Sequence, residues 1–538
     1  MTVTRWLKVI GAGLLAGLVG TLLMTLLMVV GRTWLGISPP PEALPDRFAP
    51  TLDISTFFSL FGRFGGYAGL KKFGVRSGIQ GLFAMGAIVG IVYAVIVESG
   101  RSRSTGRWRN GFSRRGLLFI LGAAIVIWLG TLAIQWPVLG ANFRGLPPTT
   151  ARIVSALGLL VAYGGYAAGL VGTYRFIMER RSTGERPVPV GEPVGRRAVV
   201  AGVVGALLAL PSFALIRRLY DQATFGYDGL TYSGPTIQKI APNDKFYAVT
   251  KNVVDPNVTK AFWRLQIDGL VAKPKTYAFD DLSALPAKNQ ETTLMCISNQ
   301  IGSGLFSNAV WHGVPLRDLL NASQPSDAAV EVKLYAADGY TDTFTFEKAM
   351  DPTTMVVYQM NGEALPQRHG YPVRVIVPGM FGEKNVKWVT RIEVIDHDGK
   401  GFYEQQGWGP NFAVPTRSDI FSPQWRRSGG KDSFAQPFPL NQPATIRGRA
   451  FAGDRGVSKI EFSADDGKTW QPVRIDYPGS RLTWVFWSFD WRPTKAGEYR
   501  LLSRATDGAG KPQSSDKHGI VPQGASGYHR VVARVGES

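Results

Sequence analysis

The sequence predicts a chain of three unlike parts: an all-α bundle of five transmembrane helices over residues 1–220, an α+β domain over 221–440, and an all-β, immunoglobulin-like sandwich over 441–538. Three observations support this multidomain fold class. The chain has 538 residues, more than the roughly 250–300 that one hydrophobic core usually supports. Five long stretches without a charged residue lie before residue 220. Short strands and helices then alternate, and only strand signals follow Pro443.

Each uncharged stretch is long enough to cross a bilayer, which takes about 20 apolar residues. The stretches occupy residues 9–31, 77–97, 116–143, 153–174 and 198–216. Six arginines lie between the second and third stretches, and six more lie between the fourth and fifth. Because basic connectors stay in the cytoplasm, we expect a multi-pass protein of the cell membrane with a cytoplasmic amino terminus and an extracytoplasmic region beyond residue 216. The long connector 32–76 is then external, although it holds six basic residues.

The net charge of +20 is concentrated in the apolar part. Residues 1–220 hold 24 Lys and Arg against 7 Asp and Glu, whereas the remaining residues hold 36 against 33. Basic residues beside long apolar stretches are typical of membrane topology, so no nucleic-acid partner is expected. Arg196-Arg197 precedes the fifth stretch and resembles a twin-arginine export signal; the alternative is an ordinary basic flank. No histidine precedes His312, so we expect no haem in the bundle.

The region after residue 220 changes in pattern. Alternating apolar residues predict strands near 263–267, 330–334 and 373–377, and short helices are expected at 280–285, 316–320 and 346–350. From residue 444 onward, about seven short strands separated by turns containing Gly and Asp favour a two-sheet sandwich.

Cys296 is the only cysteine, which excludes an intramolecular disulfide, an iron–sulfur cluster and a cysteine zinc site. It follows a predicted strand in the segment Thr293-Leu294-Met295-Cys296-Ile297-Ser298-Asn299. A thiolate there could be a nucleophile or a soft metal ligand. The alternative is a small buried hydrophobic residue.

A second cluster is rich in hydrogen-bond donors. The string His369-Gly370-Tyr371-Pro372-Val373-Arg374 is followed by Asn385-Val386-Lys387-Trp388. Imidazole, guanidinium and ammonium groups on neighbouring strands could bind a phosphate or another anion. The alternative is an ordinary basic surface.

Several separate motifs resemble those of one family, in its order and at its spacing. They are Met295-Cys296-Ile297-Ser298-Asn299, Trp311-x-Gly313-Val314-Pro315-Leu316, Tyr358-Gln359-Met360-Asn361-Gly362, His369-Gly370-x-Pro372-x-Arg374 and Asn385-Val386-Lys387-Trp388. Together they resemble the sulfite oxidase superfamily of molybdopterin-dependent oxidoreductases. The tail, with Ser463-x-Asp465-x-Gly467-x-Thr469-Trp470, is similar to that family's molybdenum-cofactor dimerisation domain.

The resemblance implies a molybdopterin (molybdenum) cofactor and a role for each matching residue. Cys296 would give its thiolate to molybdenum, and Lys251 and Trp408 would stand beside the metal as catalytic residues. The residues matching the family's cofactor-binding positions are Phe246, Tyr247, Asn252, Asp338, His369, Arg374, Asn385, Val386 and Lys387.

Two departures bear on the substrate. Lys251 stands where sulfite oxidases have an Arg, so a two-pronged clamp on an oxyanion is lost. Trp408 stands where they have a Tyr, and an indole has no ionisable hydroxyl. Both put sulfite as the substrate in doubt.

The resemblance therefore leaves three functions open. The leading one is a membrane-anchored enzyme that transfers oxygen atoms to or from a small-molecule substrate on the outer face, and exchanges electrons with an external carrier or redox subunit. The second is a reductase of sulfoxides or similar groups fed by a membrane partner. The third is a non-catalytic binding or assembly module. The resemblance of the tail also implies a homodimer.

Overall fold

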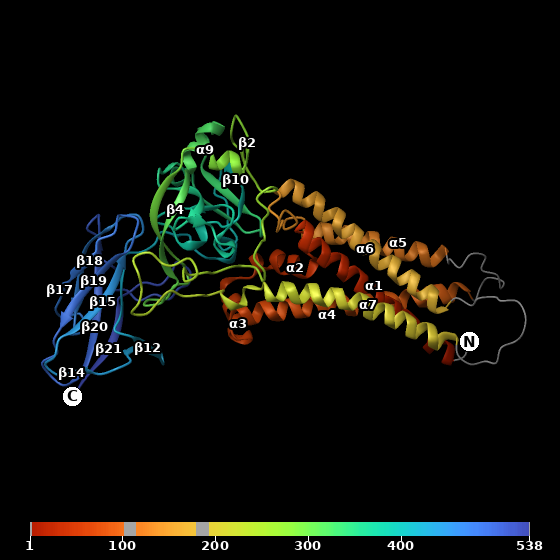
Figure 1. Cartoon of the computed structure of the whole chain (residues 1–538), viewed down its shortest axis with the longest axis horizontal. Coiled ribbons are helices and arrows are strands. Elements are labelled where there is room, and N and C mark those ends of the chain that lie inside the picture. The colour runs from red at the N-terminus through yellow and green to blue at the C-terminus, as the bar shows by residue number, and fades with distance from the viewer. Residues whose placement is uncertain (1–2, 102–113, 179–192, 537–538) are drawn as a thin grey trace, which may run out of the picture.

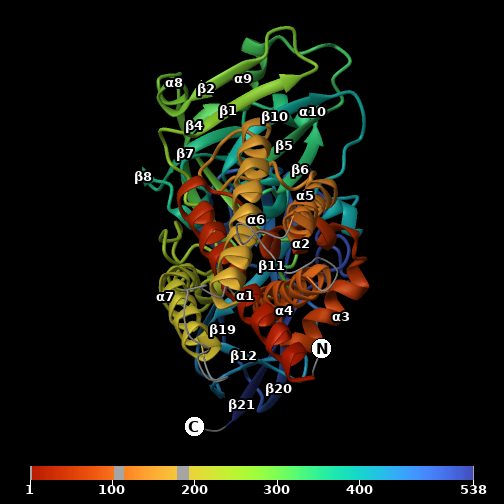
Figure 2. The ribbon, with the colours of Figure 1, turned by 90° about the vertical axis from the view of Figure 1, so that its right-hand side faces the viewer.

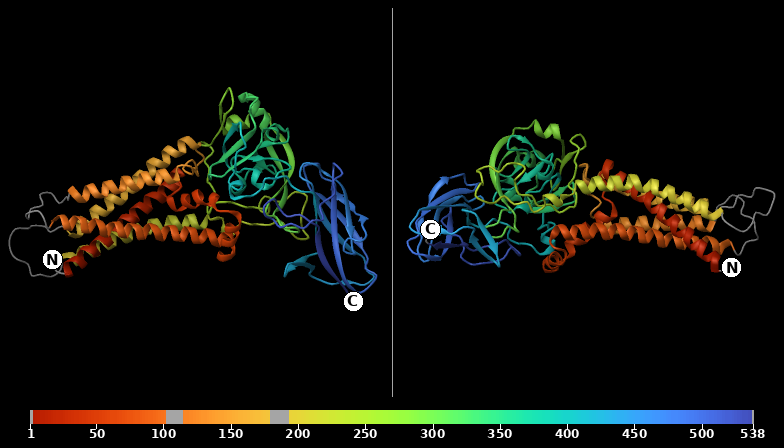
Figure 3. Two further views of the ribbon diagram at one scale, coloured as in Figure 1. Left: turned by 180° about the vertical axis from the view of Figure 1, so that it is seen from behind. Right: turned by 60° about the horizontal axis from the view of Figure 1, so that its bottom comes forward.

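The computed structural model describes residues 3–101, 114–178 and 193–536. The molecule is elongated (Figure 1): a helical bundle forms one end, two small sheets lie in the middle, and a β-sandwich forms the other end. Figure 3 shows the same order from behind, with the N-terminal end of the bundle and the C-terminal strands at opposite ends of the molecule.

Within the described residues, the bundle contains five helices that are long and apolar enough to cross a membrane. They are α1 (Val3–Val30), α4 (Tyr67–Arg101), α5 (Arg114–Gln135), α6 (Pro148–Met178) and α7 (Pro193–Asp221). Helix α1 packs against α4, α6 and α7, and Figure 2 shows the bundle end-on. Glycines permit the closest approach: a Cβ on Gly17 of α1 would lie 2.4 Å from the carbonyl oxygen of Gly86 in α4. Small residues at helix contacts allow such packing.

Helix α5 is shorter than the predicted third stretch, 116–143. It ends at Gln135, immediately before Trp136-Pro137. Proline lacks the amide hydrogen that a helix interior needs. Residues 136–147 instead reach the middle domain, where the Asn142 amide donates to the Ala337 carbonyl at 2.8 Å. Half of the twelve arginines expected to set the topology, those at positions 103, 107, 109, 180, 181 and 186, lie outside the described residues.

The connector between α1 and α4, residues 31–66, is mostly helical. It contains η1 (Gly31–Leu35), α2 (Pro40–Phe48), η2 (Ala49–Thr51) and α3 (Ile54–Phe64). Asp53 caps α3 by accepting hydrogen bonds from the amides of Ser55 and Thr56, and Gly65 ends it at φ +71°. The sequence predicted only a long external connector here, without helices. Figure 1 places α2 and α3 at the end of the bundle that faces the sheets.

The middle domain has two five-stranded sheets, as expected for an α+β fold. The first has the order β2 (Lys275–Ala278), β1 (Arg264–Gly269), β10 (Val389–Ile395), β5 (Glu331–Ala336) and β6 (Thr341–Thr345). The second has the order β3 (Lys288–Met295), β4 (Phe306–Pro315), β7 (Met355–Met360) and β8 (Glu363–Ala364), with β9 (Arg374–Ile376) paired to β7. The short helices are α8 (Phe279–Ser283), α9 (Leu316–Ser323) and α10 (Phe346–Met350).

Alternation along β1 explains its place in this domain. Trp263 precedes the strand and Leu265 and Ile267 lie within it, and all three side chains are fully buried in one core with Val332 and Leu334 of β5. Period-two alternation places such residues on one face of a sheet. The strands expected near 263–267, 330–334 and 373–377 therefore agree with β1, β5 and β9.

The C-terminal part is a sandwich of two sheets. The smaller has the order β11 (Arg417–Ser422), β15 (Ala444–Phe451), β19 (Val485–Trp491) and β18 (Arg474–Tyr477). The larger has β12 (Trp425–Ser428), β13 (Lys431–Phe434), β21 (His529–Gly536), β20 (Gly497–Asp507), β16 (Val457–Ser463) and β17 (Gln471–Pro472), with β14 (Phe438–Pro439) paired to β21. Trp487, Ile446 and Leu501 are buried between the sheets.

The sandwich begins near residue 417, so the predicted boundary at 440/441 was wrong. Strands β11, β12 and β13 precede that boundary yet belong to its two sheets. Their pattern was hard to read because Pro423 and Gly429-Gly430 interrupt the segment and few of its residues alternate.

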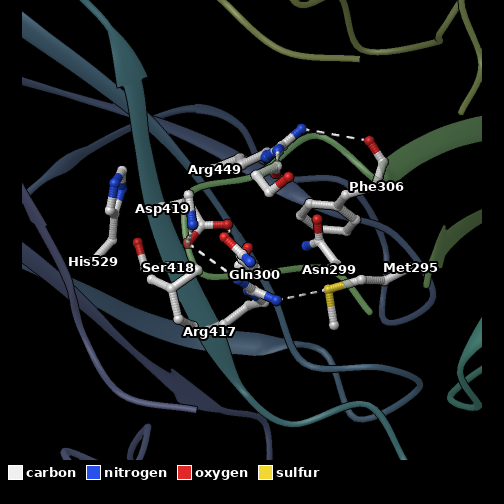
Figure 4. A network of polar contacts seen from close by, with 12 residues as sticks. Met295, Asn299, Gln300, Phe306, Arg417, Ser418, Asp419, Arg449 and His529 are labelled. Carbon is white, nitrogen blue, oxygen red and sulfur yellow. Dashed lines mark hydrogen bonds and ion pairs between the residues drawn. The ribbon is translucent and has the colours of Figure 1, made fainter. Parts of the chain in front are cut away.

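The sandwich also supports the loop that follows β3. Arg417 donates to the Met295 sulfur at 3.1 Å (Figure 4) and to the Gln300 carbonyl at 3.2 Å. Arg449 donates to the Ser303 carbonyl at 2.8 Å. Both arginines are 2% exposed. These contacts fix the segment that begins with Cys296.

Candidate active site

A cavity of about 500 Å³ lies where the connector meets the middle domain. All of the residues singled out from the sequence line it except Asn252, whose side-chain amide donates to the Asp338 carbonyl at 3.2 Å. The lining members of that set are Phe246, Tyr247, Lys251, Cys296, Asp338, His369, Arg374, Asn385, Val386, Lys387 and Trp408. Segments more than 150 residues apart in the sequence therefore meet in one cavity.

Cys296 follows the last residue of β3, so the strand aims it into the cavity. Its amide donates to the Leu305 carbonyl at 3.0 Å, and its sulfur lies 3.1 Å from the Ser298 hydroxyl oxygen. Burial, together with the nearby Glu383 carboxylate, raises the pKa of the thiol to about 12. The thiol is therefore protonated at neutral pH in the metal-free protein, and a metal cation would have to displace that proton.

His369, Arg374 and Lys387 form a basic wall of the cavity. The Arg374 guanidinium donates to the carbonyls of His369 (3.1 Å) and Asn385 (3.0 Å). The Lys387 ammonium donates to the carbonyls of Val249 and Arg368. Burial lowers the pKa of Arg374 to about 10 and also lowers that of Lys387. Burial and the neighbouring Arg374 lower the pKa of His369 to about 3, so its imidazole is neutral.

Asn385 and Phe246 shape this wall. The Asn385 side chain accepts from the Val377 amide at 2.7 Å and donates to the Phe381 carbonyl at 3.0 Å, which fixes the turn before Val386 and Lys387. The Phe246 ring packs edge-on against His369, with ring centroids 5.4 Å apart.

Lys251 lines the cavity apart from this basic wall, and several acceptors surround its ammonium. Its ammonium lies 2.9 Å from the Asp46 carboxylate of helix α2, 2.7 Å from the Asn252 side-chain oxygen and 3.1 Å from the Asp338 carbonyl. Burial raises the pKa of the Asp46 carboxyl, although the Lys251 ammonium opposes the shift. The ion pair joins the connector to the middle domain.

Trp408 has aromatic neighbours that the sequence did not reveal. Its ring centroid lies 5.9 Å from that of Phe58 in α3 and 6.4 Å from that of Tyr403. Burial, reinforced by the Cys296 thiolate, raises the pKa of the Tyr403 phenol, and the same two causes act on Tyr247. Two phenols, those of Tyr247 and Tyr403, therefore line the cavity, although the Trp408 indole itself has no hydroxyl.

Further lining residues were missed by sequence reasoning. Glu383 makes no well-formed side-chain hydrogen bond within the described part of the chain, although the amides of Ile297 and of Glu383 itself lower its pKa. Burial outweighs them and raises that pKa to about 8. Other missed lining residues include Phe57, Phe58 and Phe61 of α3, Arg368 and Tyr403. The capped, amphipathic pattern of 53–65 could have revealed α3 itself, but nothing local showed where it docks.

The residues fit a large anionic cofactor with a metal. Among side chains of the described ranges, the Arg374 Nε and the Trp408 indole N–H are buried donors with no hydrogen-bond partner, and both residues line the cavity. Buried donors normally find a partner. With the basic wall and a single thiol, the cavity offers a sulfur ligand and donors for a bound anion.

The fold and the cavity define a molybdopterin-dependent oxidoreductase, and the comparisons with known proteins agree. Residues 252–403 match the family model described as "Oxidoreductase molybdopterin binding domain", and residues 416–535 match "Mo-co oxidoreductase dimerisation domain". The chain belongs to the sulfite oxidase superfamily. It is an enzyme of that superfamily, and its cofactor is molybdopterin.

Similar proteins include two enzymes and one solved structure. Mitochondrial sulfite oxidase of Drosophila melanogaster is 28% identical over 354 residues, which cover 55% of this chain and 60% of that protein. NADH nitrate reductase of Volvox carteri is 31% identical over 288 residues, which cover 44% of this chain and 33% of that protein. The sulfane dehydrogenase SoxCD from Paracoccus pantotrophus aligns with a TM-score of 0.46 and 24% identity, covering 56% of this chain and 85% of that one. This chain therefore spans less than two thirds of the two enzymes' lengths.

Proposed function

We propose that this protein is a membrane-anchored molybdopterin oxidoreductase that transfers oxygen atoms to or from a small molecule on the outer face of the cell membrane. Electrons would be exchanged with a separate carrier or redox subunit. One observation carries the proposal: the only thiol of the chain, Cys296, points into a cavity with a basic wall. That combination suits a sulfur-bound metal held by an anionic organic group.

The cofactor, when bound, supplies two-electron oxygen-atom chemistry at molybdenum. The protein's own residues bind and orient it. Cys296 would provide the protein sulfur ligand, and Arg374, Lys387 and His369 would hold the anionic parts of the pterin. Tyr403 can donate its hydroxyl hydrogen to a substrate oxygen, and Glu383 carries a proton at neutral pH because its pKa lies near 8.

The arrangement of the bundle supports the membrane part of the proposal. The connector 31–66, the loop 136–147 and the chain leaving α7 all contact or enter the middle domain, while the first residues of α1 lie at the opposite end (Figure 1). Five crossings with a cytoplasmic amino terminus would place the cavity outside. Arg196-Arg197, at the start of α7, would then serve as a twin-arginine signal. A protease added to intact spheroplasts should digest the sandwich, and protection of the sandwich would contradict this topology.

A second candidate is a reductase of sulfoxides or similar oxidised groups, fed by a membrane partner. The ion pair between Lys251 and Asp46 favours it, because a neutralised lysine attracts an anion such as sulfite only weakly. The test compares two dye-linked reactions of the purified full chain: reduced viologen with a sulfoxide, and an oxidising dye with sulfite. Turnover with sulfite alone would refute the reductase.

The dimerisation-domain match also leads us to propose a homodimer. Sizing of the full chain in detergent by light scattering should give twice the protein mass of 58.7 kDa. A mass of one chain would refute the dimer.

A further inference from the structure

The connector contributes a wall of the catalytic cavity. Three contacts attach it and the start of α4 to the middle domain. Asp46 pairs with Lys251, the Gln406 side chain donates to the Ala49 carbonyl at 2.9 Å, and Lys71 lies 2.8 Å from the Asp228 carboxylate. The connector is therefore attached to the middle domain at its centre, through Asp46 and Ala49, and the α4 residue Lys71 adds a contact just beyond its C-terminal end.

Helix α3 turns an aromatic face to the cavity. Phe57, Phe58 and Phe61 line it, and the rings of Phe57 and Phe61 lie 4.4 Å apart. Residues at i and i+4 share one side of a helix. Ser59 and Arg63 lie on the exposed side. The Phe58 ring reaches the Trp408 ring, so aromatic groups from the bundle and from the catalytic domain form one apolar surface.

The same connector reduces the positive charge of the cavity. Lys251 stands at the position where sulfite oxidases have an anion-binding Arg, and its side chain is 5% exposed. Asp46 of α2 is its partner at 2.9 Å and is 23% exposed, and a charge pair has a much weaker field than a single charge. The aromatic lining and the charge compensation thus come from one segment, and both make the cavity less attractive to a small anion.

We infer that the connector 31–66 is the substrate-selecting wall of this enzyme, and that it favours an uncharged, apolar substrate over a small anion. This inference rests on the proposed function, because the connector can select a substrate only if the cavity that holds Cys296 is the catalytic site. It gives the helical bundle a part in catalysis beyond anchoring. Phe58 and Asp46 are then specificity-determining residues.

The single thiol allows a test that needs no turnover. The full chain, purified without cofactor from a host that cannot make it, is treated with iodoacetamide or with iodoacetate, which differ mainly in charge. Only Cys296 can form the thioether. The ratio of the two rates reports how the cavity discriminates charge, because changes in the ionised fraction of the thiol cancel in that ratio.

We expect the neutral reagent to react faster with the wild-type chain. Asp46→Asn removes the compensating charge, so it should raise the relative rate of iodoacetate roughly tenfold, as expected for one unit charge in a weakly solvated site. Asp46→Glu keeps the charge and should restore the wild-type ratio. Phe58→Ala should speed both reagents, whereas Ser59→Ala on the exposed side should change neither. An unchanged ratio in Asp46→Asn, or equal rates in Phe58→Ala and Ser59→Ala, would overturn the inference.

A second measurement separates this inference from the proposed function. Holoenzyme carrying Phe58→Ala is assayed with reduced viologen and either methyl phenyl sulfoxide or dimethyl sulfoxide. A wall that binds the apolar group predicts a KM for the aryl sulfoxide raised at least fivefold relative to that for dimethyl sulfoxide, with kcat changed less. If neither sulfoxide is turned over but the alkylation ratios shift as expected, the selecting role of the connector is supported and the proposed reductase activity is refuted. A KM raised equally for both sulfoxides would refute the claim that the connector binds the apolar group of the substrate.

Discussion

Lys71, near the start of α4, should be the most sensitive attachment between the bundle and the catalytic domain. Its ammonium lies 2.8 Å from the Asp228 carboxylate and 2.8 Å from each of the backbone carbonyls of Thr250 and Asn252. The side chains of Lys71 and Asp228 are 5% and 6% exposed. Lys71→Met would leave a buried carboxylate without its charge partner, and Thr250 would remain one of its hydrogen-bond donors.

Breaking a buried ion pair by removing one partner costs about 3–5 kcal/mol. For a unit of 150–250 residues, each kcal/mol lowers the melting temperature by about 2–4 °C, so the expected loss is roughly 6–20 °C. The assay is tryptophan fluorescence of the full chain during heating in detergent. The matched control is Lys72→Met, which removes an exposed neighbouring lysine whose ammonium lies 4.8 Å from the Phe225 ring centroid.

A double substitution sharpens this prediction. Lys71→Met combined with Asp228→Asn removes both charges, so its loss should be smaller than the sum of the two single losses. Equal melting temperatures for Lys71→Met and Lys72→Met would refute the reasoning, because the buried contact would then contribute nothing to docking.

Two further predictions concern the cavity. Because the Glu383 pKa is raised from 4.5 to about 8, the folded state keeps a proton that the unfolded state loses, and stability should fall by up to about 1.4 kcal/mol per pH unit between these values. Glu383→Gln should remove that fall, so the cofactor-free variant should melt above the wild type at pH 8 and close to it at pH 4.5; parallel curves would contradict this. Lys387→Met removes a buried ammonium whose charge-assisted hydrogen bonds to a bound anion contribute about 1.5–3 kcal/mol. Molybdenum retained after gel filtration should therefore drop at least tenfold relative to the exposed-site control Lys400→Met. Equal retention in the two variants would exclude Lys387 from cofactor binding.

Local patterns predicted much of the fold. Trp263, Leu265 and Ile267 alternate, and the structure places them in one core, because a period of two is a property of a single strand. The short helix expected at 346–350 is present as α10, where the Thr345 side chain accepts from the Lys348 amide. Both signals are contained within a few residues.

The missed features depend on contacts between distant segments. The ion pair between Asp46 and Lys251 and the ring contact between Phe58 and Trp408 join residues hundreds of positions apart or in different domains. No local pattern encodes such docking. Tyr403 was overlooked for a related reason: it precedes the short turn 404–406 and lies on no predicted strand, so no periodic pattern marks it as a lining residue.

The cavity brings together nearly all of the residues suggested by family motifs, but their roles stay predictions. The motifs marked the cofactor side, where Arg374 and Lys387 lie. The side formed by α3 had no counterpart in those motifs. Motif matching therefore described the chemistry common to the superfamily, whereas the structure adds the wall formed by α3.

X-ray absorption at the molybdenum edge, on the wild-type chain and on Cys296→Ser, tests the central claim most directly. Wild-type protein from a host that makes the cofactor should contain about one molybdenum per chain, and the variant should either lose the metal or show one fewer sulfur neighbour. Molybdenum with an unchanged number of sulfur neighbours in Cys296→Ser, or wild-type protein without molybdenum, would contradict the account.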